Sequence, residues 1–145
     1  NGGKLMSKQL STTNLFDIIR NIETRLNNLE KALFPIENWR YIGESGQPNF
    51  ENSWTNYNTS THQSCAFYKD SFGIVRLKGA VSTGTISSSI FTLPVGYRPL
   101  KSINQTVLSN GAFGIIQINS SGTVICTTGT NTIVSLDNIA FRAEG

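Results

Sequence analysis

Six apolar residues near the start of the chain recur at alternating steps of four and three: Leu15, Ile19, Ile22, Leu26, Leu29 and Leu33. A seven-residue apolar repeat places all of them on one stripe of a helix and is typical of a coiled coil. Ile19, Leu26 and Leu33 fall at one core position of the repeat, and the other three at the second. The sequence therefore predicts a coiled-coil helix, roughly 30 Å long at about 1.5 Å per residue.

Two arrangements would cover this stripe. In the first, parallel copies pack together, and Arg25 and Glu30 have the spacing that joins neighbouring helices across a parallel seam. Mixed Leu and Ile at the core positions favour a trimer at least as much as a dimer, so we predict a homotrimer. In the second, the helix folds back on its own domain. Phe16, Ile18 and Ala32 widen the stripe, which either that fold or a higher oligomer would use.

The chain changes character at Pro35, which cannot continue a helix, whereas Thr13 or Asn14 can cap the helix start. We expect residues 13–35 to form the trimerisation helix and residues 36–145 a β-rich head. Residues 1–12 have no apolar signal core and no starting Met, and we expect a flexible segment cut from something longer.

After Pro35 the apolar residues alternate with polar ones. In "GIVRLKGAVSTG", Val75, Leu77 and Val81 face one way and Arg76 and Lys78 the other, which predicts one half-buried strand. The stretches "SCAFYKD", "AFGIIQI", "GTVICTT" and "TIVSLDNIAFRA" have the same pattern, and "INSSGTVI" predicts a hairpin at Gly122. Short strands with no helix between them predict a mainly β head, an antiparallel β-sandwich or jelly-roll.

The stretch "IFTLPVGYRP" breaks a strand firmly. Ile90, Phe91 and Leu93 would finish a core strand that Pro94 ends, and Gly96 lets the backbone turn. Pro99 pushes Arg98 toward an extended conformation. We therefore predict an architectural corner formed by Pro94, Gly96, Tyr97, Arg98 and Pro99, packed either against its own sheet or across a subunit boundary.

Known catalytic and metal-binding motifs are missing from the sequence. There is no GxSxG, HExxH or phosphate-binding glycine loop, and His62, the only histidine, lies in a polar loop. We expect no enzyme activity, cofactor or metal. The basic residues are scattered along the chain, which argues against nucleic-acid binding. The sequence contains no apolar run of about twenty residues, so nothing in it indicates membrane insertion. Cys65 and Cys126 read as reduced, core-facing thiols, which favours folding in a cytoplasm.

The long loop from Gly43 to His62 has little strand pattern, and such loops are more often functional than idle. It offers aromatic rings among amide and hydroxyl groups, the chemistry of a sugar-binding surface. We name Trp54, Tyr57, Asn58 and His62 as candidate ligand-binding residues. For Trp54 and Tyr57 a packing role is an equal alternative, and for Trp39 packing is the favoured role.

The segments "FGIVRLKGAV" and "IFTLPVGYRP", residues 72–99, resemble the C-terminal domains of bacteriophage tail fibres and receptor-binding proteins. The resemblance implies a homotrimer at the tail tip of a virion, folded in the host cytoplasm and joined to the rest of the phage tail. It also implies adhesion to a bacterial cell-surface glycan or teichoic-acid-like polymer. Two alternatives stay open: a domain that only trimerises and registers a longer fibre, and a secreted trimeric ligand of the C1q or tumour-necrosis-factor type.

Overall fold

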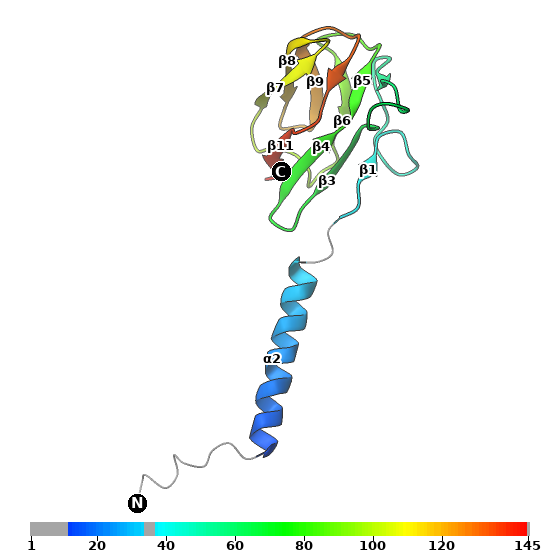
Figure 1. Cartoon of the computed structure of the whole chain (residues 1–145). Coiled ribbons are helices and arrows are strands. Elements are labelled where there is room, and N and C mark those ends of the chain that lie inside the picture. Colours follow the sequence, from blue (N-terminus) through cyan, green and yellow to red (C-terminus); the bar gives the residue numbers. More distant parts are fainter. Residues whose placement is uncertain (1–11, 34–36, 145) are drawn as a thin grey trace, which may run out of the picture. The chain divides into compact units, whose positions relative to one another are not determined.

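The computed structural model describes residues 12–33 and 37–144, and the chain divides between Pro35 and Ile36 into two compact units. Figure 1 shows one helix in the first unit and only strands and loops in the second. The predicted flexible segment lies outside the described residues except for Thr12, and so does Pro35.

The first unit is the helix α2, Thr12–Leu33. It confirms that the repeat forms a helix, but the helix begins one residue before the predicted start. Thr13 and Asn14 therefore lie inside α2, and the prediction that either caps it is wrong. All six residues of the apolar stripe are exposed, each by 43–58%.

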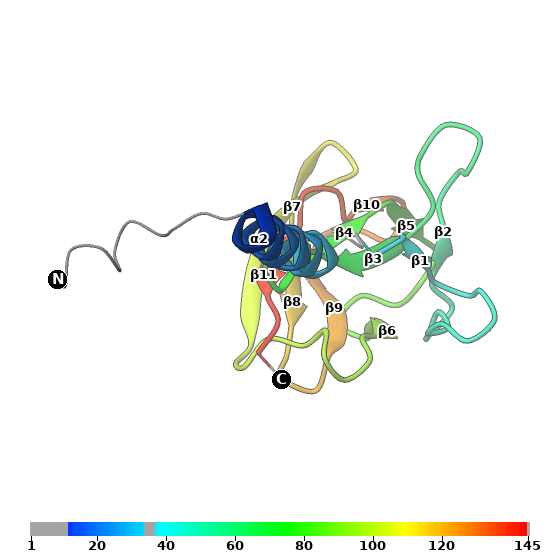
Figure 2. The same ribbon diagram turned by 90° about the horizontal axis from the view of Figure 1, so that it is seen from below.

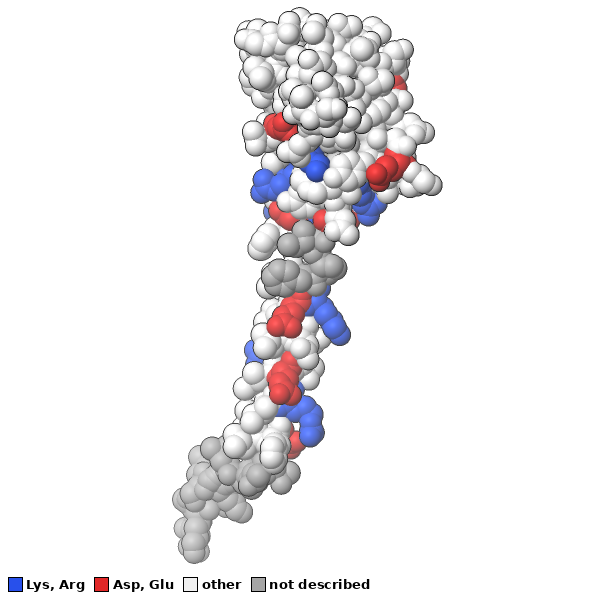
Figure 3. Space-filling model, turned by 45° about the vertical axis from the view of Figure 1, so that its right-hand side comes forward, with Lys and Arg blue, Asp and Glu red and all other residues white. Residues whose placement is uncertain are grey.

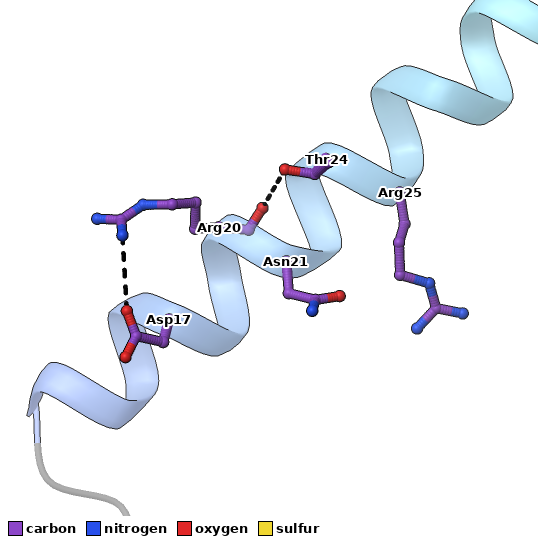
Figure 4. Close-up of a pocket in the computed structure, with 5 residues that line it drawn as sticks. All are labelled: Asp17, Arg20, Asn21, Thr24 and Arg25. Carbon is purple, nitrogen blue, oxygen red and sulfur yellow. Dashed lines mark hydrogen bonds and ion pairs between the residues drawn. The ribbon is translucent and has the colours of Figure 1, made fainter.

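Polar side chains occupy another side of α2. Figure 4 labels Asp17, Arg20, Asn21, Thr24 and Arg25, which line an open hollow of about 370 Å³ on the helix surface. Arg20 pairs with Asp17 at 3.6 Å, and the Thr24 hydroxyl donates to the Arg20 carbonyl at 2.9 Å. These local contacts support a solvated helix face, and the hollow is only the space between its side chains.

The second unit consists of two antiparallel sheets, and Figure 2 labels their strands in a second view. The smaller has the order β1-β3-β4-β11 and the larger the order β2-β5-β10-β7-β8-β9-β6. The strands are β1 (Arg40–Tyr41), β2 (Thr55–Asn56), β3 (Ala66–Lys69), β4 (Ile74–Lys78), β5 (Ala80–Ser82), β6 (Ser89–Thr92), β7 (Ile103–Ser109), β8 (Ala112–Ile118), β9 (Thr123–Thr128), β10 (Val134–Ser135) and β11 (Ala140–Arg142).

One hydrophobic core holds the two sheets together. Val75 and Leu77 point inward from β4, and Ile116 and Ile118 point inward from β8. Strand alternation explains this placement, because successive side chains lie on opposite faces of a sheet. Two antiparallel sheets around one core agree with the predicted sandwich.

The stretch "GIVRLKGAVSTG" is not the single strand that its alternation predicted. It forms β4 in the smaller sheet and β5 in the larger sheet, with a break at Gly79, which has φ +103°. A Cβ on Gly79 would lie 2.6 Å from the backbone of Cys65, so only glycine fits here. The chain crosses from one sheet to the other at this residue.

The stretch "TIVSLDNIAFRA" likewise forms two strands, β10 in the larger sheet and β11 in the smaller. The hairpin at Gly122 is confirmed as the turn between β8 and β9. A second hairpin, between β7 and β8, turns at Asn110 and Gly111, with φ angles of +49° and +79°. An Asn-Gly pair is the usual signature of such a turn, and β7 was missed because its sequence is mostly polar.

The thiols of Cys65 and Cys126 are free and buried in the core, as predicted. Burial raises the pKa of both thiols, and the charge of Asp137 adds to the effect at Cys65. Because only the thiolate reacts readily, both groups serve as small apolar core residues.

Candidate functional site

The loop from Gly43 to His62 contains only one short strand, β2. The four predicted binding residues in this loop do not lie together, because one is buried and three are exposed. Trp54 is 1% exposed, and its indole lies so close to Gly84 that a Cβ there would come within 2.1 Å of the ring. A ring in this position has no face to offer a sugar. The structure therefore places Trp54 in the core, and a binding role for it is not supported.

The other three predicted residues come together on one exposed turn, which we call the Tyr57 turn (Tyr57–His62). The rings of Tyr57 and His62 meet edge to face with centroids 5.0 Å apart. Asn58 shapes the turn, because its side-chain oxygen accepts from the Ser60 N–H at 3.0 Å and its carbonyl from the His62 N–H at 2.8 Å. This turn presents rings, a hydroxyl and an amide to solvent, the chemistry expected of a neutral sugar site.

The corner at Pro94–Pro99 packs within its own chain. Tyr97 is buried, with its ring edge to face against Phe67 at 5.1 Å. The Arg98 Nε donates to the Leu93 carbonyl at 2.8 Å, and the Lys69 ammonium donates to the Gly96 carbonyl at 2.8 Å. Of the two arrangements left open by the sequence, these contacts support packing within the chain. The strand that is contacted, β3, belongs to the smaller sheet, however, whereas the corner joins β6 and β7 of the larger sheet.

The carboxylate of Glu37 contacts this corner and its neighbours. We call the residues involved the Glu37 clamp: Glu37, Arg40, Lys69 and Tyr97. The Tyr97 hydroxyl donates to Oε1 of Glu37, and the Lys69 backbone N–H donates to Oε2 at 3.0 Å. The Arg40 guanidinium lies 3.2 Å from the same carboxylate. The clamp fixes the chain at the first described residue of the second unit to a corner sixty positions away.

The pKa values in the clamp shift in opposite directions. Burial favours the neutral carboxyl of Glu37, but the hydrogen bonds from Tyr97 and Lys69 and the charge of Arg40 outweigh it and lower its pKa. Burial and then the neighbouring carboxylate raise the pKa of Tyr97 to about 12. A carboxylate and a neutral phenol are therefore the stable pair, which suits a structural contact.

A second candidate site lies on the outer face of the smaller sheet and was not predicted. A pocket of about 260 Å³ opens there, and we call it the Trp39 pocket. Its aromatic and polar lining residues are Trp39, Gln63, Arg76, Lys78, Asp137 and Asn138. The alternation in the sequence predicts that Arg76 and Lys78 lie on this face. Trp39 lies beside them because β1 and β4 both pair with β3, which the sequence pattern around Trp39 does not predict.

Two of these residues, Trp39 and Lys78, contact each other and are held by two neighbouring tyrosines. The Lys78 Nζ lies 4.4 Å from the centroid of the Trp39 ring and 4.9 Å from that of Tyr41, and it donates to the Tyr41 hydroxyl at 3.2 Å. The Trp39 ring also meets Tyr68 edge to face at 4.5 Å. The expected packing role of Trp39 is thus only partly fulfilled, because its half-buried ring also forms a wall of the pocket.

The outer face of β7, β8 and β9 has a different character. No charged residue or histidine occurs between Ser102 and Leu136. Leu108 and Phe113 lie opposite each other in the β7–β8 pair and are both exposed by more than 60%. In Figure 3, Lys and Arg side chains of this unit gather toward one end, and most of the surface beyond them is uncharged. Depletion of charge around exposed apolar residues is typical of protein contact surfaces.

Among the residues that the structure describes, no helix is long and apolar enough to span a membrane. In the same residues, no three side chains of the His, Cys, Asp or Glu type gather as a metal site would require.

No family model matches the chain, and no curated protein does. The chain is similar to a solved structure, the crystal structure of the receptor binding protein (gp15) of Listeria phage PSA. The two share 15% sequence identity with a TM-score of 0.66, over 99% of this chain and 86% of that one. The chain thus shares its fold with a bacteriophage receptor binding protein.

Proposed function

We propose that this protein is a phage receptor-binding tip that attaches the virion to a bacterial cell-surface saccharide without cleaving it. The observation that carries the proposal is the shared fold, which extends over nearly the whole chain. Fold alone does not determine function, so the proposal also needs a means of assembly and a binding surface.

The assembly that we propose is a parallel homotrimer held by α2. Its stripe of exposed Leu and Ile side chains is costly in water and would be buried between copies. A hollow of about 290 Å³ on this stripe is lined by Ile22, Arg25, Leu26 and Leu29. Four residues at these spacings form the hole that receives one core side chain of a neighbouring helix, here Leu26 of a second copy.

The residues beside the stripe bear on how many chains assemble. Phe16 and Ile18 are exposed apolar residues at the flanking positions and widen the surface that needs cover. A wider stripe favours three helices over two. The uncharged outer face of β7, β8 and β9 offers a further surface for contact between copies held together in this way.

The binding surface that we propose is the Tyr57 turn. It is exposed, its backbone is held by Asn58, and its groups suit the apolar face and hydroxyls of a pyranose. Three identical weak sites on one trimer raise the effective concentration for second contacts, so modest affinity per site gives firm attachment. The remaining partner in this proposal is the rest of the phage tail.

Molar mass by light scattering tests the assembly. The whole chain should have three times its mass of 15.9 kDa, and a chain that starts at Ile36 should have a much smaller mass. A monomeric whole chain would contradict the trimer and remove the multivalent attachment with it.

Adsorption to candidate host cells tests recognition, with Tyr57→Ala as the variant. Phe72→Ala is the matched control, because Phe72 is an exposed aromatic residue in the turn beyond the other end of β3. The proposal expects the Tyr57 variant to stay trimeric and to adsorb at least tenfold less well, with the control unchanged. If no trimer adsorbs to any candidate host, a domain that only trimerises and registers a longer fibre becomes the better account.

A further inference from the structure

We infer that the Trp39 pocket is a binding site for a saccharide that carries an acidic group. The inference rests on the proposed function for the source of the ligand, a cell-surface polymer, but its chemistry comes from the pocket itself. It assigns a second site, on the smaller sheet, whose lining shares no residue with the Tyr57 turn.

The aromatic wall of the pocket is held in place before any ligand arrives. Trp39 is half-buried, and its edge-to-face contact with Tyr68 at 4.5 Å and the Lys78 ammonium at 4.4 Å restrict the ring. A fixed indole beside open space can cover the apolar face of a sugar ring at little entropic cost.

Lys78 supplies a cation on the pocket face of β4. Among the described residues, no carboxylate forms an ion pair with it. An ammonium has three N–H donors, and the Tyr41 hydroxyl takes one of them. The two aromatic rings hold the charge in position through cation–π contacts and leave donors for a ligand.

Arg76 adds a second cation on the same face, two residues along β4. Its Nε lies 3.9 Å from the Asp70 carboxylate, a long separation at a side chain that is 50% exposed. Such a pair is weak, so Arg76 keeps the freedom to meet an acidic ligand.

The remaining lining residues suit sugar hydroxyls. Asp137 is fixed, because one of its oxygens accepts from the Gly79 N–H at 2.8 Å. Its other oxygen and the amides of Gln63 and Asn138 provide acceptors and donors around the pocket. The pocket therefore holds two cations against one carboxylate, and an acidic substituent would face Lys78 and Arg76 while hydroxyls meet the other side chains.

The two tryptophans of the chain allow a direct test. Trp39 lines the pocket and Trp54 lies in the core, so the whole chain labelled with 5-fluorotryptophan should give one reporting signal and one internal control. Trp39→Phe assigns the signals. The probes are glucuronate, glucose 1-phosphate, neutral glucose and inorganic phosphate, each titrated at low salt and at 150 mM salt.

The inference expects both acidic sugars to shift the Trp39 signal, with at least tenfold higher affinity than glucose, while the Trp54 signal stays in place. Lys78→Gln should remove most of this preference, and Lys101→Gln, at an exposed lysine outside the pocket lining, should keep it. Equal affinity for glucose and its acidic relatives would overturn the inference. So would an unchanged preference in Lys78→Gln, or phosphate binding as tightly as glucose 1-phosphate.

These outcomes are separate from those of the proposed function. A chain that binds acidic sugars in solution but adsorbs to no cell keeps the pocket and loses the receptor role. A trimer that adsorbs through the Tyr57 turn, with a silent Trp39 signal, keeps the receptor role and loses the pocket.

Discussion

The hydroxyl of Tyr97 donates its hydrogen bond to the carboxylate of Glu37, across sixty positions of sequence. It joins the corner between β6 and β7 to the first described residue of the second unit. We expect Tyr97→Phe to lower the free energy of unfolding by about 1 kcal/mol, because the carboxylate loses one donor but remains partly solvated. Urea unfolding of the chain that starts at Ile36 measures it. Tyr68→Phe, at a half-buried ring of β3, is the control and should cost less.

The same pair predicts how stability depends on pH. The pKa of Glu37 is lowered in the folded state, so its contribution is present above its ordinary value of 4.5 and is lost as the pH falls below that value. The pKa of Tyr97 is raised to about 12, so its contribution is present below its ordinary value of 10 and is lost as the pH rises from there toward 12. The stability difference between wild type and Tyr97→Phe should therefore be flat from about pH 5 to 10. A difference that grows above pH 10 would contradict this assignment.

Charge reversal along α2 tests the parallel seam. Arg25→Glu should place two acidic residues together between neighbouring helices and lower the melting temperature of the trimer. Each lost pair is worth about 0.5 kcal/mol, and a trimer has three such pairs. Adding Glu30→Arg to the same chain should restore most of the loss, measured by thermal melting at low salt. Asp17→Arg, at a residue that pairs with Arg20 of its own helix, is a control that should not be rescued by Glu30→Arg.

Gly79 should tolerate no side chain. Gly79→Ala combines a φ of +103° with a Cβ only 2.6 Å from the Cys65 backbone, and we expect a loss of at least about 2 kcal/mol. Gly73→Ala is matched in conformation, with φ +80° and no atom within 4 Å of the added Cβ, and should cost about 1 kcal/mol. Equal losses in the two variants would show that strain alone, without the close approach of Cys65, governs Gly79.

Trp54 should act through stability and not through binding. Trp54→Ala should cost about 3–5 kcal/mol because it leaves a large cavity in the core. Trp54→Phe should cost less, since it keeps an aromatic ring and removes an indole N–H that has no hydrogen-bond partner among the described residues. Thermal unfolding measures both changes. A Trp54→Ala variant of unchanged stability would place this side chain outside the core.

The sequence by itself determined the features that depend on neighbouring residues. The seven-residue repeat predicted a helix at α2, the alternation predicted β8 and β9, and the Pro and Gly spacing predicted the turn after β6. These patterns are legible because a helix or strand places residues at a fixed period on one face.

Only the tertiary structure decided which of those faces meet. Trp54 and Tyr57 lie three residues apart in one polar loop, yet Trp54 packs against Gly84 in the core and Tyr57 is 40% exposed. The same holds for Trp39 and Lys78, which are brought together by the pairing of β1 and β4 with β3. Contacts between distant segments depend on which strands pair and on where the chain changes sheet, and a single glycine, Gly79, makes that change inside an unbroken alternation.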